Sequence, residues 1–198
     1  LIGALGQHLV EHYGEDTAAQ FLFEVWNEPN DNFWRGTQQQ YFELYTEAAQ
    51  ALKRASPRMQ VGGPATNCPE CWIEDFVHFC RNSSIPFDFV SSHAYSSCAM
   101  EGLGSVTKVA TQIKGAKADL DNATAGMAEQ PPWLITEFGA NCGQGIGAPG
   151  ADQFPSAIHD MIDQASYTIA AVEALAGPGE PQALSYWAVS DVFEEQFF

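Results

Sequence analysis

The chain has 198 residues and a formal net charge of −17, from 25 acidic and 8 basic residues. Nucleic acid is therefore not expected as a partner, because phosphate backbones would be repelled. No apolar run approaches the ~20 residues of a membrane-spanning helix. The length suits a single domain but is short for a complete (β/α)8 barrel, which usually takes about 250 residues.

Helical and strand-like patterns alternate along the whole chain. Apolar stripes with helical spacing predict helices over residues 2–13, 33–56, 70–81, 105–121 and 155–176. Short apolar runs predict strands that follow them, over residues 17–26, 59–64, 87–95, 133–138 and 183–189. Strict alternation predicts a parallel sheet with right-handed crossovers. A doubly wound sheet satisfies the same alternation, but it more often shows a glycine-rich phosphate loop after its first strand, and this chain has none.

The first predicted strand ends in a polar pair. Its apolar run, residues 21–26, leads into Asn27 and Glu28, and Pro29 then removes a backbone donor. Regular strand alternation places Glu24 and Glu28 on one face and Asn27 on the other. Glu28 is thereby predicted at the carboxyl end of the strand, where barrels and open α/β sheets carry their active sites.

A second apolar run, residues 132–138, ends in the same way. It delivers Glu137, and Gly139 follows as a turn residue. The two glutamates can meet only if their strands stand in one sheet. Alone, each would be read as a solvated loop residue. As a pair at one strand-end pocket they suggest glycoside hydrolysis, in which one carboxyl group is the acid and the other the nucleophile or base.

These two motifs resemble those of a known family. Residues 23–30, with Phe33 and Trp34, resemble the acid/base motif of glycoside hydrolase family 39, the β-xylosidase and α-L-iduronidase family of clan A, and residues 135–138 resemble its nucleophile motif. The resemblance continues in order through residues 61–65, 92–95 and 186–195. It implies that residues 1–198 are part of a catalytic (β/α)8 TIM barrel, covering strands 4 to 8 with the intervening helices.

The resemblance also implies roles for the polar residues. Glu28 becomes the general acid/base and Glu137 the nucleophile of a retaining enzyme, with carboxyl groups about 5–5.5 Å apart. Asn27 is expected to bind the sugar 2-hydroxyl, with a cap on the following turn as the competing interpretation. His93 and Tyr95 are expected at the subsite, where a strand-end His is otherwise usually structural.

Three further positions are expected to bind substrate. Trp187 can stack on the flat face of a sugar, although core packing is the alternative. The resemblance implies that Glu194 and Glu195 hydrogen-bond distal hydroxyls of a xylosyl unit. Glu24 is expected to face the barrel interior, and because no basic residue is an obvious partner, we expect its partner in strands outside this chain.

The function that follows is a retaining exo-glycosidase, most simply a β-1,4-xylosidase acting on xylo-oligosaccharides or another glycoside. An α-L-iduronidase, or another clan A hydrolase such as a β-glucosidase, is the alternative. Only Arg35 lies near a motif, which speaks against a uronic-acid substrate. A carbohydrate-binding pseudoenzyme is the alternative of another class. No cofactor and no metal are expected, and the oligomeric state is not predicted.

The five cysteines are interpreted as disulfide-forming. Cys68 and Cys71 have the spacing of a zinc knuckle, but Cys80, Cys98 and Cys142 offer no return pair. Disulfides, with the fifth thiol left over or paired to a part of the protein outside this chain, indicate an oxidising compartment. Together with two N-glycosylation sequons, at residues 82–84 and 122–124, this predicts a secreted or lumenal glycoprotein.

Overall fold

The computed structural model describes residues 1–96, 105–140, 162–176 and 181–186. Six helices and five strands occur in these ranges: α1 (Ile2–Tyr13), α2 (Glu15–Ala18), β1 (Leu22–Glu24), α3 (Gln38–Ala55), β2 (Gln60–Thr66), α4 (Ile73–Ser83), β3 (Phe89–Tyr95), α5 (Val106–Ala123), β4 (Trp133–Gly139), α6 (Ile162–Leu175) and β5 (Ala183–Tyr186). All ten predicted elements that reach into these ranges are present, but the first strand is confined to Leu22–Glu24, and the start of the stretch predicted for it belongs to α2. The parts predicted at residues 155–161 and 187–189 lie outside the described residues.

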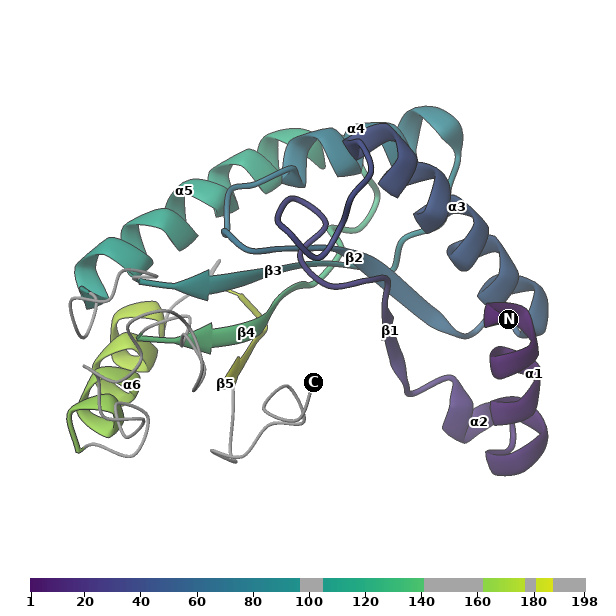
Figure 1. Cartoon of the computed structure of the whole chain (residues 1–198), viewed down its shortest axis with the longest axis horizontal. Coiled ribbons are helices and arrows are strands. Elements are labelled where there is room, and N and C mark those ends of the chain that lie inside the picture. Colours follow the sequence, from purple (N-terminus) through teal and green to yellow (C-terminus); the bar gives the residue numbers. More distant parts are fainter. Residues whose placement is uncertain (97–104, 141–161, 177–180, 187–198) are drawn as a thin grey trace.

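The strands form one curled parallel sheet. Its order is β1-β2-β3-β4-β5, and every neighbouring pair is parallel. Helices α3, α4 and α5 run along its convex side (Figure 1). A doubly wound sheet would reverse its strand order at a switch point, and this order does not reverse. The fold is therefore a partial (β/α)8 barrel, which confirms the expected fold class.

The hydrophobic core lies between the sheet and these helices. Val90 and Ala94 of β3 are buried in it, together with aromatic side chains of α3 and α4 such as Tyr41 and Phe76. Because side chains alternate along a strand, the odd-numbered residues of β3 point to the opposite, concave face. His93 is among them, and its side chain is fully buried.

The local structure around Glu28 differs from the regular strand expected there. Strand β1 ends at Glu24, and Trp26 and Glu28 then adopt positive φ angles of 73° and 43°. Simple alternation from Glu24 to Glu28 was therefore the wrong basis for placing Glu28. The helix expected from residue 33 begins only at Gln38, because Thr37 and Gln40 form a capping box and the preceding residues form a turn.

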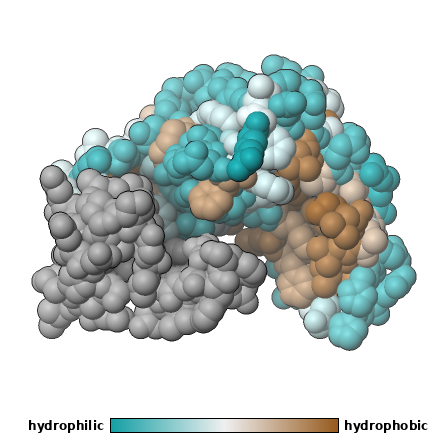
Figure 2. Space-filling view, in the orientation of Figure 1, coloured by the Kyte–Doolittle hydropathy of each residue, from teal (hydrophilic) through white to brown (hydrophobic). Residues whose placement is uncertain are grey.

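One surface region carries exposed apolar side chains. Figure 2 shows them gathered over α1 and β1. Leu5, Phe21 and Leu22 expose 45%, 36% and 51% of their surface. Strand β1 is also the edge of the sheet. Among the described helices, none combines the length and apolarity required to cross a bilayer.

Candidate active site

A bulge in β4 aims Glu137 at the concave face. In the pairing of β3 with β4, Ser92 aligns with Ile135, but the next residue, His93, aligns with Glu137, so Thr136 is an extra residue. The register of β4 against β5 shifts over the same stretch. Ile135 is part of the core beneath the helices. Strict alternation would place Glu137 on that same side, and the extra residue instead brings it beside Thr136 on the concave face.

A second bulge supports the backbone of Glu28. In β2, Pro64 aligns with Ser91 and Thr66 with Ser92, so Ala65 is the extra residue, with a φ of 55°. Its carbonyl oxygen accepts a hydrogen bond from the Glu28 N–H at 2.9 Å. The two left-handed residues therefore meet, and this contact fixes the Glu28 backbone just beyond the end of β1.

The imidazole of His93 lies between the two predicted catalytic carboxylates. Its Nδ1 is 2.8 Å from Glu28 Oε1 and 3.3 Å from Glu137 Oε2. One carboxylate oxygen of each glutamate and the histidine nitrogen lie within 4.8 Å of one another. The Tyr95 hydroxyl donates to Glu137 Oε2 at 2.8 Å. The curl of the sheet thus brings together four residues that the sequence places on three separate strands.

The surroundings of Glu137 shift its pKa in both directions. Burial raises the pKa of this carboxyl group, and the nearby Glu28 raises it further, whereas His93 and the hydrogen bond from Tyr95 lower it. Burial is the largest of these effects, and the net direction is upward. Burial and the charge of Glu137 also raise the pKa of Tyr95 far above its usual range. Tyr95 is therefore protonated and available as a donor.

Glu24 has a partner within this chain. Its Oε2 accepts a hydrogen bond from Thr136 Oγ1 of β4 at 2.7 Å, so the expectation that its partner lies only in other strands is wrong. The hydroxyl could not be foreseen because it reaches Glu24 only through the curl of the sheet. Glu24 also lines a cavity of about 440 Å³ together with Trp26, Asn27 and Phe33.

Not all of the predicted binding residues can be placed. Asn27 is half-buried and lines this cavity. Trp187, Glu194 and Glu195 lie outside the described residues, so their predicted contacts stay predictions.

Glu28, His93 and Glu137 are the described residues whose donors could surround a cation. The 2.8 Å approach of His93 Nδ1 to Glu28 is, however, the length of a charge-assisted hydrogen bond. Cys68 and Cys71 form a disulfide, which rules out the zinc-knuckle alternative for this pair, and Cys80 is a buried free thiol. Cys98 and Cys142 lie outside the described residues.

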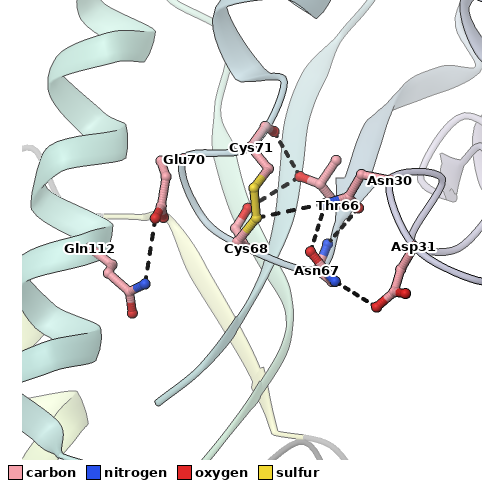
Figure 3. The surroundings of a disulfide bond; sticks show 8 residues. All are labelled: Asn30, Asp31, Thr66, Asn67, Cys68, Glu70, Cys71 and Gln112. Carbon is pink, nitrogen blue, oxygen red and sulfur yellow. Dashed lines mark hydrogen bonds between the residues drawn. A yellow bond between two sulfur atoms is a disulfide. The ribbon is translucent and has the colours of Figure 1, made fainter. Parts of the chain in front are cut away.

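Sequence reasoning missed the residues that hold the loops around the site. The loop after Glu28 contacts the disulfide turn after β2 through Asn30 and Asn67 (Figure 3). The sequence marked Pro29 as the end of a strand and Cys68 and Cys71 as disulfide-forming, but it gave no sign that the two loops touch. Nothing in a single sequence pairs two asparagines that lie 37 residues apart.

The fold and the side chains of Glu28, His93, Tyr95 and Glu137 define a barrel with a paired-carboxylate site at the carboxyl ends of its strands. The family model of glycosyl hydrolases family 39 matches residues 1–197, and the chain belongs to this family. It is 36% identical to a β-xylosidase of Geobacillus stearothermophilus and 32% identical to one of Caldicellulosiruptor saccharolyticus, each over 98% of this chain. The crystal structure of a monomeric β-xylosidase from Caulobacter crescentus CB15 matches 98% of the chain with a TM-score of 0.81 and 31% identity. The chain spans 38% of the length of each of these three proteins.

Proposed function

We propose that the protein containing this chain is a retaining exo-glycosidase that removes a β-1,4-linked xylosyl unit, and that residues 1–198 are part of its catalytic domain. One observation carries the proposal. In a member of this family, Glu28 and Glu137 meet at His93, with one carboxylate oxygen of each no more than 4.8 Å from one of the other. That spacing supports a retaining mechanism, because inverting enzymes hold their carboxyl groups about 6.5–9.5 Å apart to admit a water molecule.

The proposed reaction has two displacements. In the first, a Glu137 carboxylate oxygen bonds to the anomeric carbon while Glu28 gives its proton to the departing glycosidic oxygen. In the second, Glu28 takes a proton from water, the water oxygen bonds to the anomeric carbon, and the Glu137 ester bond breaks. The β-configuration is restored, and both glutamates return to their starting protonation states.

His93 and Tyr95 are proposed to orient this pair. Tyr95 donates to Glu137 Oε2, so we assign the attack on the sugar to Oε1. His93 contacts Glu28 and Glu137 together, so one side chain sets the position of both carboxylates. We assign the remaining subsite contacts to Asn27, Trp187, Glu194 and Glu195, on the resemblance stated above.

The decisive experiment follows the anomeric proton by NMR in the natural protein that contains this chain. Aryl β-xyloside, aryl β-glucoside and aryl α-L-iduronide are compared, with Glu28→Gln and Glu137→Gln as variants. We expect β-xylose as the first product, and we expect its steady release to be lost in both variants, because Glu28→Gln also lacks the base that the second displacement needs. Preferred hydrolysis of the iduronide or the glucoside would replace the xylosidase assignment. Xylose binding without turnover of any substrate would favour the pseudoenzyme.

Azide rescue assigns the two roles separately. In Glu137→Ala, azide can enter the space left by the nucleophile and should give the α-xylosyl azide. In Glu28→Ala, azide should attack the covalent intermediate and give the β-azide. The reverse pattern would exchange the two roles.

We also propose that the protein containing this chain is secreted and glycosylated. Asn82 and Ser84 of the first sequon are exposed. In the second sequon Thr124 is buried, and its hydroxyl donates to Leu120 O at 2.7 Å. We therefore expect Asn82 to carry the glycan. Expression through a eukaryotic secretory pathway should give a mass increase that Asn82→Gln abolishes and Asn122→Gln preserves.

A further inference from the structure

The loop that follows Glu28 is locked to the turn that follows β2. Asn30 Nδ2 donates to Asn67 Oδ1 at 2.6 Å, and the Asn67 backbone N–H donates to Asn30 Oδ1 at 3.0 Å. Asn30 Nδ2 also lies 3.7 Å from Cys68 Sγ (Figure 3). Both ends of the Asn30 amide therefore bond to the same turn. The Asn67 side chain in addition donates to Asp31 at 2.8 Å, which adds a second bond to the loop.

The turn on which Asn30 rests is itself closed. Cys68 and Cys71 are joined by a disulfide. The carbonyl oxygens of both cysteines accept hydrogen bonds from the Thr66 hydroxyl, at 3.2 Å and 2.9 Å. Thr66 is fully buried at the end of β2. Because the turn is tied covalently across its ends and bonded to the strand, it is a fixed point for the neighbouring loop.

The backbone conformation of Glu28 has to be held in place by neighbouring contacts. Its φ of 43° lies in the left-handed region, which a residue with a Cβ keeps only when its surroundings impose it. The Glu28 carbonyl oxygen accepts the Asp31 N–H at 3.0 Å, so Glu28 and Asn30 belong to one tight turn. If the Asn30 contacts were lost, the part of this turn that follows Glu28 would no longer be held against the disulfide turn. The Glu28 carboxyl group would then move relative to His93.

We propose that Asn30 is a positioning residue for Glu28, and that the Cys68–Cys71 disulfide turn is its anchor. The proposal rests on the function proposed above, in which Glu28 protonates the leaving group. Its consequence is specific to that step. A displaced acid slows the departure of poor leaving groups, which need a proton, and spares good ones, which do not. A general loss of structure would slow both.

The test compares two substrates on the natural protein that contains this chain. Xylobiose has a poor leaving group and 2,4-dinitrophenyl β-xyloside a good one. Asn30→Ala should lose about 10–100-fold in kcat/KM on xylobiose, since misplacement by about 1 Å can cost 10²-fold, but less than about threefold on the dinitrophenyl xyloside. The double variant Cys68→Ser/Cys71→Ser should show the same selectivity. Asn32→Ala is the matched control, because Asn32 lies exposed in the same loop, and it should leave both values unchanged.

Glu28→Gln separates the two proposals. If it shows the leaving-group selectivity and Asn30→Ala does not, the positioning role is overturned and the acid role stands. If Glu28→Gln loses activity equally on both substrates, the acid role fails and the positioning role fails with it. Should Asn30→Ala not fold, Asn30→Asp keeps the size of the side chain but replaces the Nδ2 donor with a charged acceptor facing Asn67 Oδ1, and it should show the same selectivity. Wild-type selectivity in the double cysteine variant would overturn the anchoring role of the disulfide.

Discussion

Thr136 Oγ1 donates to Glu24 Oε2 at 2.7 Å although two strands lie between β4 and β1. A hydrogen bond between non-adjacent strands spans the concave face, so it is possible only because the sheet curls. Its loss would leave Glu24, a half-buried carboxylate, without this donor.

We therefore expect the nearly isosteric Thr136→Val to lower the free energy of unfolding by about 1–3 kcal/mol. Thr136→Ser keeps the hydroxyl and should lose much less. Denaturant unfolding of the natural protein measures both. Equal effects of the two variants would show that packing of the methyl group matters here, and the hydrogen bond does not.

Tyr95→Phe should move the acidic limb of the kcat/KM profile to higher pH. The hydrogen bond from Tyr95 lowers the pKa of Glu137, so its removal raises that pKa further, and Glu137, the proposed nucleophile, then ionises at a higher pH. A loss of about tenfold or more in kcat/KM at neutral pH is expected from a lost hydrogen bond to a charged group. Tyr13→Phe, at an exposed position of α1, is the control. An acidic limb that stays in place would contradict this role of Tyr95.

Glu137→Gln should stabilise the fold at neutral pH. The pKa of Glu137 is raised in the folded state, so the folded protein holds this proton more tightly than the unfolded chain does. Below the unfolded pKa of about 4.3 both states are protonated, and there is no penalty. As the pH rises above that value, the unfolded state ionises first and the fold loses stability.

The Tm gain from Glu137→Gln over wild type should consequently be larger at pH 7 than at pH 4. The exposed Glu129→Gln is the control and should give similar Tm differences at both pH values. A gain at pH 4 as large as that at pH 7 would contradict the assigned shift.

The 198-residue chain prepared alone should self-associate. Strand β1 is an edge strand in this structure, and Leu22 on it is 51% exposed. Leu22→Lys should reduce association because a charge on an edge strand opposes pairing with another chain. Ile169→Lys is the matched control on α6, where the native side chain is 69% exposed. Size-exclusion chromatography with light scattering measures both variants. A sharp monomer peak for the unmodified chain would contradict this prediction.

Much of the fold follows from the sequence because local patterns carry it. Apolar runs that end in polar residues mark the strands, and amphipathic stripes mark the helices between them. Their alternation requires a parallel sheet, and a parallel sheet gathers its carboxyl ends at one edge. Strand patterning therefore predicts that Glu28 and Glu137 lie at one edge of the sheet, whereas the places of His93 and Tyr95 at the site were expected from the family resemblance.

The sequence by itself determined that Glu28 and Glu137 follow strands of one parallel sheet, and the tertiary structure alone decided how these side chains face the site. A period of two predicts faces only along a regular strand. The extra residue in β4 and the left-handed backbone at Glu28 break that period, because they depend on register against neighbouring strands. The bond from Thr136 to Glu24 and the amide pair of Asn30 and Asn67 likewise join residues that only the curl of the sheet and its loops bring together. A bulge or a pairing across a sheet is a property of several segments at once, and no single segment encodes it.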